Sequence, residues 1–256
     1  MQLKTWVGAG ATLAMLLLSG CAPMTKVKDV LADKQAYMDA NFSPDKLAKD
    51  VVQTVNSADQ GPLGFHTMVF HLSWQLNDDD KNKTVAIDQT ISMRNVGGSI
   101  VQHQIDDSRN GVPMSQTYWL SYRGLVVLKG QQLNVGAAIV GIPYVVKSFQ
   151  HFDAANSPAA SGTIDYQFKV GNAAQFMNFQ SGRETCSRGS DYPATKVNAQ
   201  LAGEAHDLDC TSYNANAVKV HSTRYVYLVK YGVAVAVHTE FATGISDARV
   251  TSVTIE

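Results

Sequence analysis

Hydrophobic and polar residues alternate one by one along much of the chain after residue 64. In the stretch 65–76, Met68, Phe70, Leu72 and Trp74 stand at every second position. A period of two places such side chains on one face of an extended strand. Further strands are predicted at residues 85–94, 99–106, 118–122, 125–128, 164–170, 218–231, 233–241 and 249–255, of which 125–128 is fully apolar.

Turn signals between these stretches predict antiparallel pairing. Gly97-Gly98 and Asn110-Gly111 each separate two consecutive strands, and Asn-Gly is a strong signal for a two-residue hairpin. Hairpin connections join antiparallel neighbours. We therefore expect a mainly β protein of about nine or ten strands, built as a single antiparallel sheet or half-barrel or as a β-sandwich.

The residues before the strands follow a helical period. Val27, Val30, Leu31 and Met38 recur at spacings of three, four and seven positions within a polar background, as on one face of a helix. We expect residues 21–42 to form a tether with a possible helix.

A second helix start follows at Ser43. The order Ser43, Pro44, Asp45 places an N-cap residue, a proline and an acid at the beginning of a helix. The apolar stripe of this helix consists of Leu47, Val51 and Val55. We expect the stripe to pack against the strand face that begins with Met68, within a β domain spanning residues 43–256.

Two segments give weaker patterns. The apolar stretch 131–147 is interrupted by glycine and proline, so it fits either a short buried helix or a bulged strand. Residues 186–210 are poor in apolar side chains and rich in turn residues, which predicts an irregular segment.

Composition narrows the class of protein. Apolar residues make up 45% of the chain and charged residues 17%, which excludes a disordered chain. There are 21 basic and 22 acidic residues, for a net charge of −1. Without a basic excess or a basic stripe, nucleic acid is not an expected partner.

The first residues form a secretion signal. Lys4 precedes an apolar stretch over residues 6–18, which is shorter than the roughly 20 residues of a membrane-spanning helix. A positive start, a short apolar core and a small-residue exit are typical of a signal peptide. The exit reads Leu18-Ser19-Gly20-Cys21, and this motif resembles the lipobox of bacterial lipoproteins.

The resemblance implies a lipid anchor. In bacterial lipoproteins the chain is cut before the lipobox cysteine, which receives a diacylglyceryl group on sulfur and an acyl group on the new amino terminus. Carried over, residues 1–20 would be the signal peptide and Cys21 the lipidated first residue. An Asp after the cysteine often retains such proteins in the inner membrane. Ala22 therefore implies the outer membrane, with the protein facing the periplasm.

The two other cysteines fit an exported protein. Once Cys21 is lipidated, Cys186 and Cys210 remain as an even pair in an oxidising compartment, and we expect them to form a disulfide. His206 lies nearby, but one histidine and two cysteines at irregular spacing make a weak zinc pattern.

Few residues suggest catalysis or a metal site. Asp78, Asp80 and Asn82 match the first positions of a calcium loop, but Lys83 and Gln89 replace its glycine and glutamate. The chain contains no nucleophile elbow, no zinc-protease motif and no phosphate-binding loop. We expect no cofactor, no metal and no enzymatic activity.

Three carboxylates near the cysteines are Glu184, Glu204 and Asp209, and sequence proximity alone does not say whether they meet.

The functional expectation rests on location and surface. We expect an outer-membrane lipoprotein of the bacterial envelope that binds a hydrophobic ligand or an envelope partner protein. Outer-membrane lipoproteins that carry lipids or other lipoproteins in half-barrels share this location and β-rich composition, but no motif maps onto them residue by residue. The alternatives are a structural or surface adhesion module and an unrecognised hydrolase.

Overall fold

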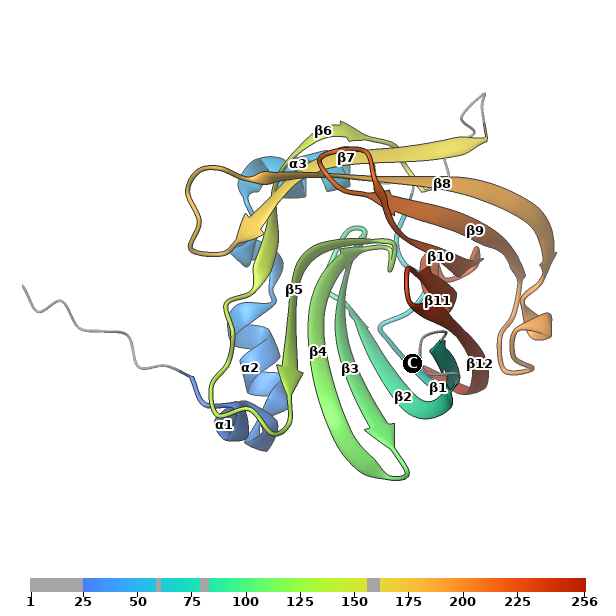
Figure 1. The fold of residues 1–256 in the computed structure, drawn as a ribbon. Helices are drawn as coiled ribbons and strands as arrows, with labels where there is room; N and C mark the ends of the chain where they lie inside the picture. Colours follow the sequence, from blue (N-terminus) through green and yellow to red (C-terminus); the bar gives the residue numbers. More distant parts are fainter. Residues whose placement is uncertain (1–24, 59–60, 79–82, 156–161) are drawn as a thin grey trace, which may run out of the picture.

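Twelve antiparallel strands follow one another around a closed barrel in the computed structural model of this chain (Figure 1). The structure describes residues 25–58, 61–78, 83–155 and 162–256. The strands are β1 Thr67–Asp78, β2 Lys83–Asn95, β3 Ile100–Arg109, β4 Val112–Tyr122, β5 Val126–Asn134, β6 Tyr144–Phe152, β7 Thr163–Asn172, β8 Gln180–Pro193, β9 Glu204–Tyr213, β10 Lys219–Leu228, β11 Val233–Phe241 and β12 Gly244–Ile255.

The mainly β class is confirmed, but the predicted sheet, half-barrel or sandwich of nine or ten strands is wrong. The sheet closes on itself because β1 pairs with β12 along nearly its full length, from Met68 opposite Ile255 to Trp74 opposite Ala248 and beyond. This pairing joins the two ends of the β domain, so no local sequence pattern announces it. Predicted hairpins such as Asn110-Gly111 are present, with φ values of 52° and 76°, as a type I′ turn requires.

The three additional strands lie in the two weakly patterned segments. The undecided stretch 131–147 contains the end of β5, a loop and the start of β6. Strands β8 and β9 run through the segment 186–210, which we expected to be irregular. Only Cys186 is buried along the whole of β8, so its strand conformation depends on pairing with β7 and β9 and not on hydrophobic alternation.

Pairing is weakest between β5 and β6, where it is limited to Lys129 opposite Val145 and Gly130 opposite Tyr144. The helices cover this seam from outside the barrel. In Figure 1, α1 (Val27–Ala32) and α2 (Lys34–Asn41) lie beside β5, and α3 (Lys49–Ser57) lies next to β6.

Polar contacts fix the helices on the outer face of the sheet. The Gln102 side chain on β3 donates a hydrogen bond to the Phe42 carbonyl at 2.8 Å. The Tyr37 hydroxyl on α2 donates to Gln131 on β5 at 2.6 Å. An ion pair between Lys34 and Asp106 adds a third contact at 2.6 Å. None of the helices in the described part of the chain is long and apolar enough to cross a membrane.

The helical predictions are right in kind and wrong in detail. Residues 26–42 are not a tether, because Val27, Val30 and Met38 are buried. Pro44–Lys46 forms only a 3₁₀ turn, and extended backbone at Leu47 separates it from α3.

The stripe of Leu47, Val51 and Val55 is buried as expected. It packs, however, in a cluster with Val145 and Val146 of β6 and not on the strand face that begins with Met68, which belongs to a second cluster.

That second cluster fills one end of the barrel interior. Met68, Phe70 and Leu72 point inward there with residues from β10 and β11. The connection between β8 and β9 adds Ala194 and Leu201, both almost fully buried. The other end of the barrel interior remains open.

Candidate functional site

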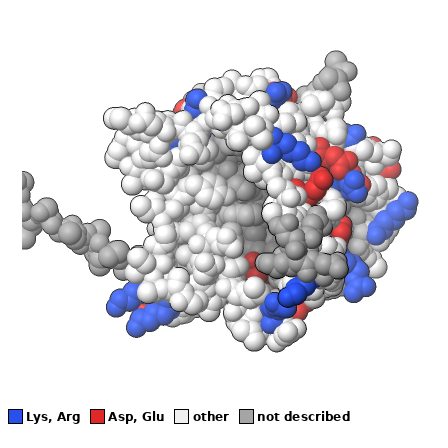
Figure 2. Space-filling view, viewed as in Figure 1, with Lys and Arg blue, Asp and Glu red and all other residues white. Residues whose placement is uncertain are grey.

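A cavity of about 1320 Å³ occupies the open end of the barrel. This is larger than the roughly 300–1,000 Å³ of most small-molecule sites. Figure 2 shows a hollow near the middle of the visible face, surrounded mostly by uncharged atoms. The apolar side chains that line the cavity include Trp74, Leu76, Ile87, Ile91, Met93, Ile105, Trp119, Tyr144, Phe168, Val170, Val220, Tyr225, Val235 and Phe241.

The alternation along each strand explains this lining. Trp74 and Leu76 share the inward face of β1, and Ile87 and Ile91 share that of β2. On β4 the side chains divide between the two faces of the wall. Trp119 lines the cavity, whereas Tyr118 packs outward against the rings of Tyr37 and Phe42.

Two glycines let aromatic rings lie flat against the cavity wall. Gly182 on β8 stands opposite Phe168 on β7, and a Cβ built on Gly182 would lie 2.5 Å from the Phe168 ring. Gly130 stands opposite Tyr144 across the β5–β6 seam, and its Cβ would lie 2.4 Å from the Tyr144 ring. A larger residue at either glycine would push the ring toward the cavity.

Two carboxyl groups, Asp107 and Glu184, interrupt the apolar wall, and Glu184 is the less well hydrogen-bonded of the two. Glu184 on β8 points inward, and its register partner on β9 is Ser212, whose partner on β10 is His221. All three line the cavity. The Ser212 hydroxyl donates a long hydrogen bond of 3.4 Å to Glu184 Oε2. Desolvation raises the pKa of Glu184 from 4.5 to about 7, and the Ser212 hydrogen bond opposes this only weakly.

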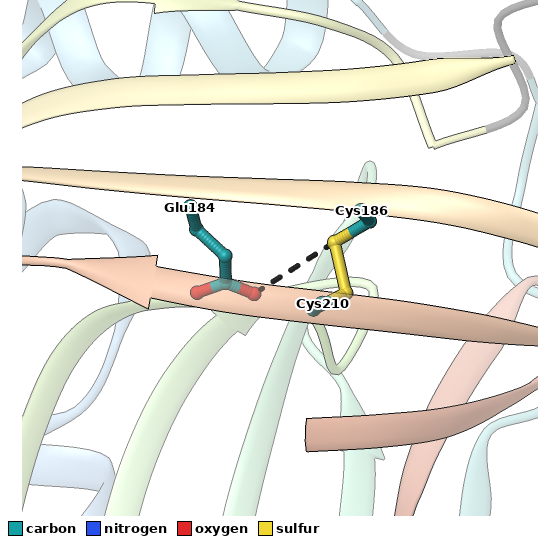
Figure 3. A group of neighbouring side chains, drawn as sticks. All are labelled: Glu184, Cys186 and Cys210. Atoms are coloured by element: carbon teal, nitrogen blue, oxygen red, sulfur yellow. Dashed lines mark hydrogen bonds between the residues drawn. A yellow bond between two sulfur atoms is a disulfide. The ribbon is translucent and has the colours of Figure 1, made fainter. Parts of the chain in front are cut away.

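The disulfide lies immediately beside this carboxyl group (Figure 3). Cys186 and Cys210 face each other directly on β8 and β9, and their sulfur atoms are 2.04 Å apart. Cys186 Sγ lies 3.9 Å from Glu184 Oε1. A disulfide sulfur carries no hydrogen, so only the protonated carboxyl could donate in this contact.

This grouping is neither a metal site nor a catalytic triad. Glu184, Cys186 and Cys210 bring three possible ligand atoms together, but both sulfurs are engaged in the disulfide. A serine triad requires a histidine between the serine and the acid. Here Ser212 contacts Glu184 directly, and among the described residues no hydrogen bond links His221 to either of them.

The cavity offers little positive charge. Among its described lining residues there is no lysine and a single arginine, Arg183. The Arg183 guanidinium makes two hydrogen bonds to Asp165, at 2.9 and 3.1 Å. Burial lowers the pKa of His103 to about 3, which keeps this lining histidine neutral. The interior therefore suits an uncharged ligand group better than an anionic one.

Comparison with known proteins places the chain in no family. No protein-family model and no curated protein match the sequence. The structure is similar to a β-barrel-like protein of domain of unknown function DUF1849 from Brucella abortus. That match has a TM-score of 0.44 and 7% identity, and it covers 75% of this chain and 98% of the other. A DUF1329 family protein from Desulfovibrio piger is similar with a TM-score of 0.38 and 10% identity, over 81% of this chain and 91% of the other.

The candidate site residues of the sequence have different positions in the structure. Cys21, and Asp80 and Asn82 of the suspected calcium loop, lie outside the described residues. The expected pair Cys186 and Cys210 is at disulfide distance. Of the nearby acids, Glu184 faces the cavity, whereas Asp209 points outward and pairs with Arg224 at 2.8 Å. Glu184 and Cys186 are two positions apart, so they lie on the same face of a strand. A prediction of β8 as a strand would therefore have placed Glu184 on the inward face.

Proposed function

We propose that this protein is an outer-membrane lipoprotein of the bacterial envelope that binds a lipid acyl chain inside its barrel and performs no catalysis. The observation that carries the proposal is the large cavity with an apolar lining, filled at one end by the core and open at the other. Each methylene transferred from water into such a lining contributes about 0.8 kcal/mol. The affinity of an acyl chain for the cavity therefore increases with each methylene that the cavity encloses.

The polar groups suggest how a lipid would lie. The interior holds two carboxyls, Asp107 and Glu184, and no available cation, so an anionic headgroup inside would remain unpaired at considerable cost. An acyl chain directed toward the filled end, with its headgroup at the open end, avoids that cost. Lipidation at Cys21 would keep the protein beside a source of such chains.

A fluorescent fatty acid tests this proposal. Purified protein is titrated with cis-parinaric acid, whose fluorescence rises in an apolar site. Ala236 lines the cavity, and Ala236→Trp should fill part of it and weaken binding at least tenfold. Val229→Trp at the exposed opposite end is the matched control and should leave binding unchanged. Equal binding by all three proteins, or no binding by the wild type, contradicts the proposal.

The same cavity argues against the alternatives. An adhesion module needs an exposed surface and gains nothing from a hollow apolar interior. An envelope partner protein remains the second candidate, because a segment of a partner could enter the open end. In that case cis-parinaric acid would fail to bind, while the chain would still cross-link to a protein in intact cells.

A further inference from the structure

Exposed hydrophobic side chains collect at one end of the barrel. In an up-and-down barrel every second connection lies at the same end. The described part of the chain has twelve large, exposed hydrophobic residues, and eleven of them lie in or beside the connections at the cavity mouth. These eleven residues, here called the apolar rim, are Val112, Met114, Ile139, Ile142, Tyr144, Phe176, Met177, Val218, Val220, Phe241 and Ile245. The remaining one, Val229, is at the opposite end.

The β7–β8 connection carries the most exposed members of the apolar rim. Phe176 is 88% exposed and Met177 70% exposed, although their loop is fixed by hydrogen bonds from the Gln175 side chain to the Met177 and Asn178 carbonyls, at 2.8 and 2.9 Å. An ordered loop that holds two large apolar side chains in water is unfavourable unless something covers them.

The beginning of the described chain lies at the same end. The Thr25 carbonyl accepts a hydrogen bond from the Val140 amide at 3.0 Å, and Lys26 forms a β-bridge with Ile139 of the apolar rim. Four residue steps separate Cys21 from Thr25, a reach of about 14 Å at most. A lipid on Cys21 would therefore hold the apolar rim close to the membrane surface.

Exposed basic residues stand beside the apolar rim. They include Lys26, Lys83 at the start of β2 and Arg109 at the end of β3. In Figure 2 charged atoms gather mainly toward the right-hand side and the lower left, and the surface around the hollow is mostly uncharged. Apolar side chains surrounded by a few cations match the acyl boundary and the phosphate groups of a lipid surface.

We propose that the apolar rim docks on a phospholipid bilayer, so that the cavity opens directly onto the membrane. This rests on the proposed function for its purpose, because a mouth pressed against the bilayer lets an acyl chain pass between membrane and barrel without crossing water. The docking itself is a separate physical claim, because eight of the eleven rim side chains, with Phe176 and Met177 the most exposed, do not line the cavity.

The test places a polarity-sensitive label at each end of the full chain. In a Cys21→Ser background, Phe176→Cys and Val229→Cys are each labelled with the fluorophore NBD and mixed with vesicles of phosphatidylethanolamine and phosphatidylglycerol. At position 176 the emission should shift to shorter wavelengths, and lipids with a nitroxide on the acyl chain should quench it several-fold more than at position 229. Because the N-terminal segment emerges beside the apolar rim, attachment through that segment would also bring position 176 to the vesicle. Met177→Asp is therefore added to the labelled Phe176→Cys protein: it keeps the N-terminal segment, and it should lose most of the response if the apolar rim docks, whereas an unchanged response would overturn the proposal.

Three further outcomes would overturn the proposal: equal responses at the two positions, no response at position 176, or a shift at position 176 that grows with protein concentration in the absence of vesicles. The last would show that a second copy of the chain covers the rim. Adding Ala236→Trp to the labelled Phe176→Cys protein should leave its response intact, since the label would then report on the bilayer and not on a lipid in the cavity. Binding of cis-parinaric acid without any vesicle response would leave the proposed function standing and remove this inference alone.

Discussion

Glu184 shows how the position of one residue sets its chemistry. It lies on a strand whose outer face is largely exposed, yet it points toward the aromatic rings of the cavity. The folded protein holds the pKa of this carboxyl near 7 because ionisation there loses hydration, and the single long hydrogen bond from Ser212 compensates little. The charge of the cavity therefore changes near neutral pH.

This raised pKa predicts a pH-dependent cost in stability. Folding raises the pKa of this carboxyl from 4.5 to about 7, so its protonated form favours the folded state. This contribution to stability is complete below pH 4.5 and is lost as the pH rises through 7. Glu184→Gln should therefore unfold at higher urea concentration than the wild type at pH 8 and at the same concentration at pH 4. The upper limit of the gain is about 3 kcal/mol, reduced where water in the cavity reaches the carboxyl.

The control for this variant is Glu240→Gln. Glu240 is exposed and its pKa is lowered by the hydrogen bond and charge of Lys219, so its replacement should not stabilise the protein at pH 8. If Glu184→Gln differs from the wild type by the same amount at pH 4 and pH 8, the carboxyl is not desolvated as described.

At the scale of the helices and strands, the sequence pattern predicted the elements that bury a regular stripe of apolar side chains. Strand β1 and the stripe of α3 follow directly from periods of two and four, because burial on one face selects residue type at those positions. Hydrophobic alternation did not predict strand β8, because Cys186 is its only fully buried residue. The partner of α3 was also misplaced, since a stripe records that a face is buried but not which strand covers it.

Helix α3 gives a direct test of its packing on β6. Val51 is completely buried beside the weak β5–β6 seam, so Val51→Asp would place an unpaired charge in the core and destabilise the fold by several kcal/mol. Gln53→Asp puts the same charge on the exposed side of the same helix and should cost little. Thermal unfolding followed by circular dichroism compares the two. Equal melting temperatures would mean that the helix does not close the seam.

Strand β8 buries only Cys186 fully, and the disulfide from this residue ties the strand to the better buried β9. Cys186 and Cys210 join directly opposed positions in the cavity wall, and removal of such a bond typically costs 2–5 kcal/mol. The Cys186→Ser, Cys210→Ser double variant should unfold at clearly lower urea concentration than the oxidised wild type. The reduced wild type should behave like the variant. Peptide mapping that finds either cysteine as a free thiol in the native protein would remove this prediction.

At the scale of the whole molecule, closure of the barrel was beyond sequence reasoning. The cavity exists because β1 meets β12 and because the β8–β9 connection closes one end, and both depend on pairings between residues far apart in the chain. Alternation fixed which side chains share a face, but a curved open sheet and a closed barrel have the same alternation. The expected location of the protein differs in this respect, because that prediction rests entirely on the short local motif Leu18–Cys21.

That motif leads to the last prediction, which concerns membrane attachment. If Cys21 carries the lipids, Cys21→Ala should remove the protein from the outer-membrane fraction, because acyl chains contribute about 0.8 kcal/mol per buried methylene and the apolar rim alone binds more weakly. Cells fed radioactive palmitate provide the measurement. The wild-type band should be labelled and the Cys21→Ala band unlabelled, while Cys186→Ala, which also loses a cysteine, should keep the label. An unlabelled wild-type band would end the lipoprotein assignment, and the apolar rim would then have to account for any membrane binding by itself.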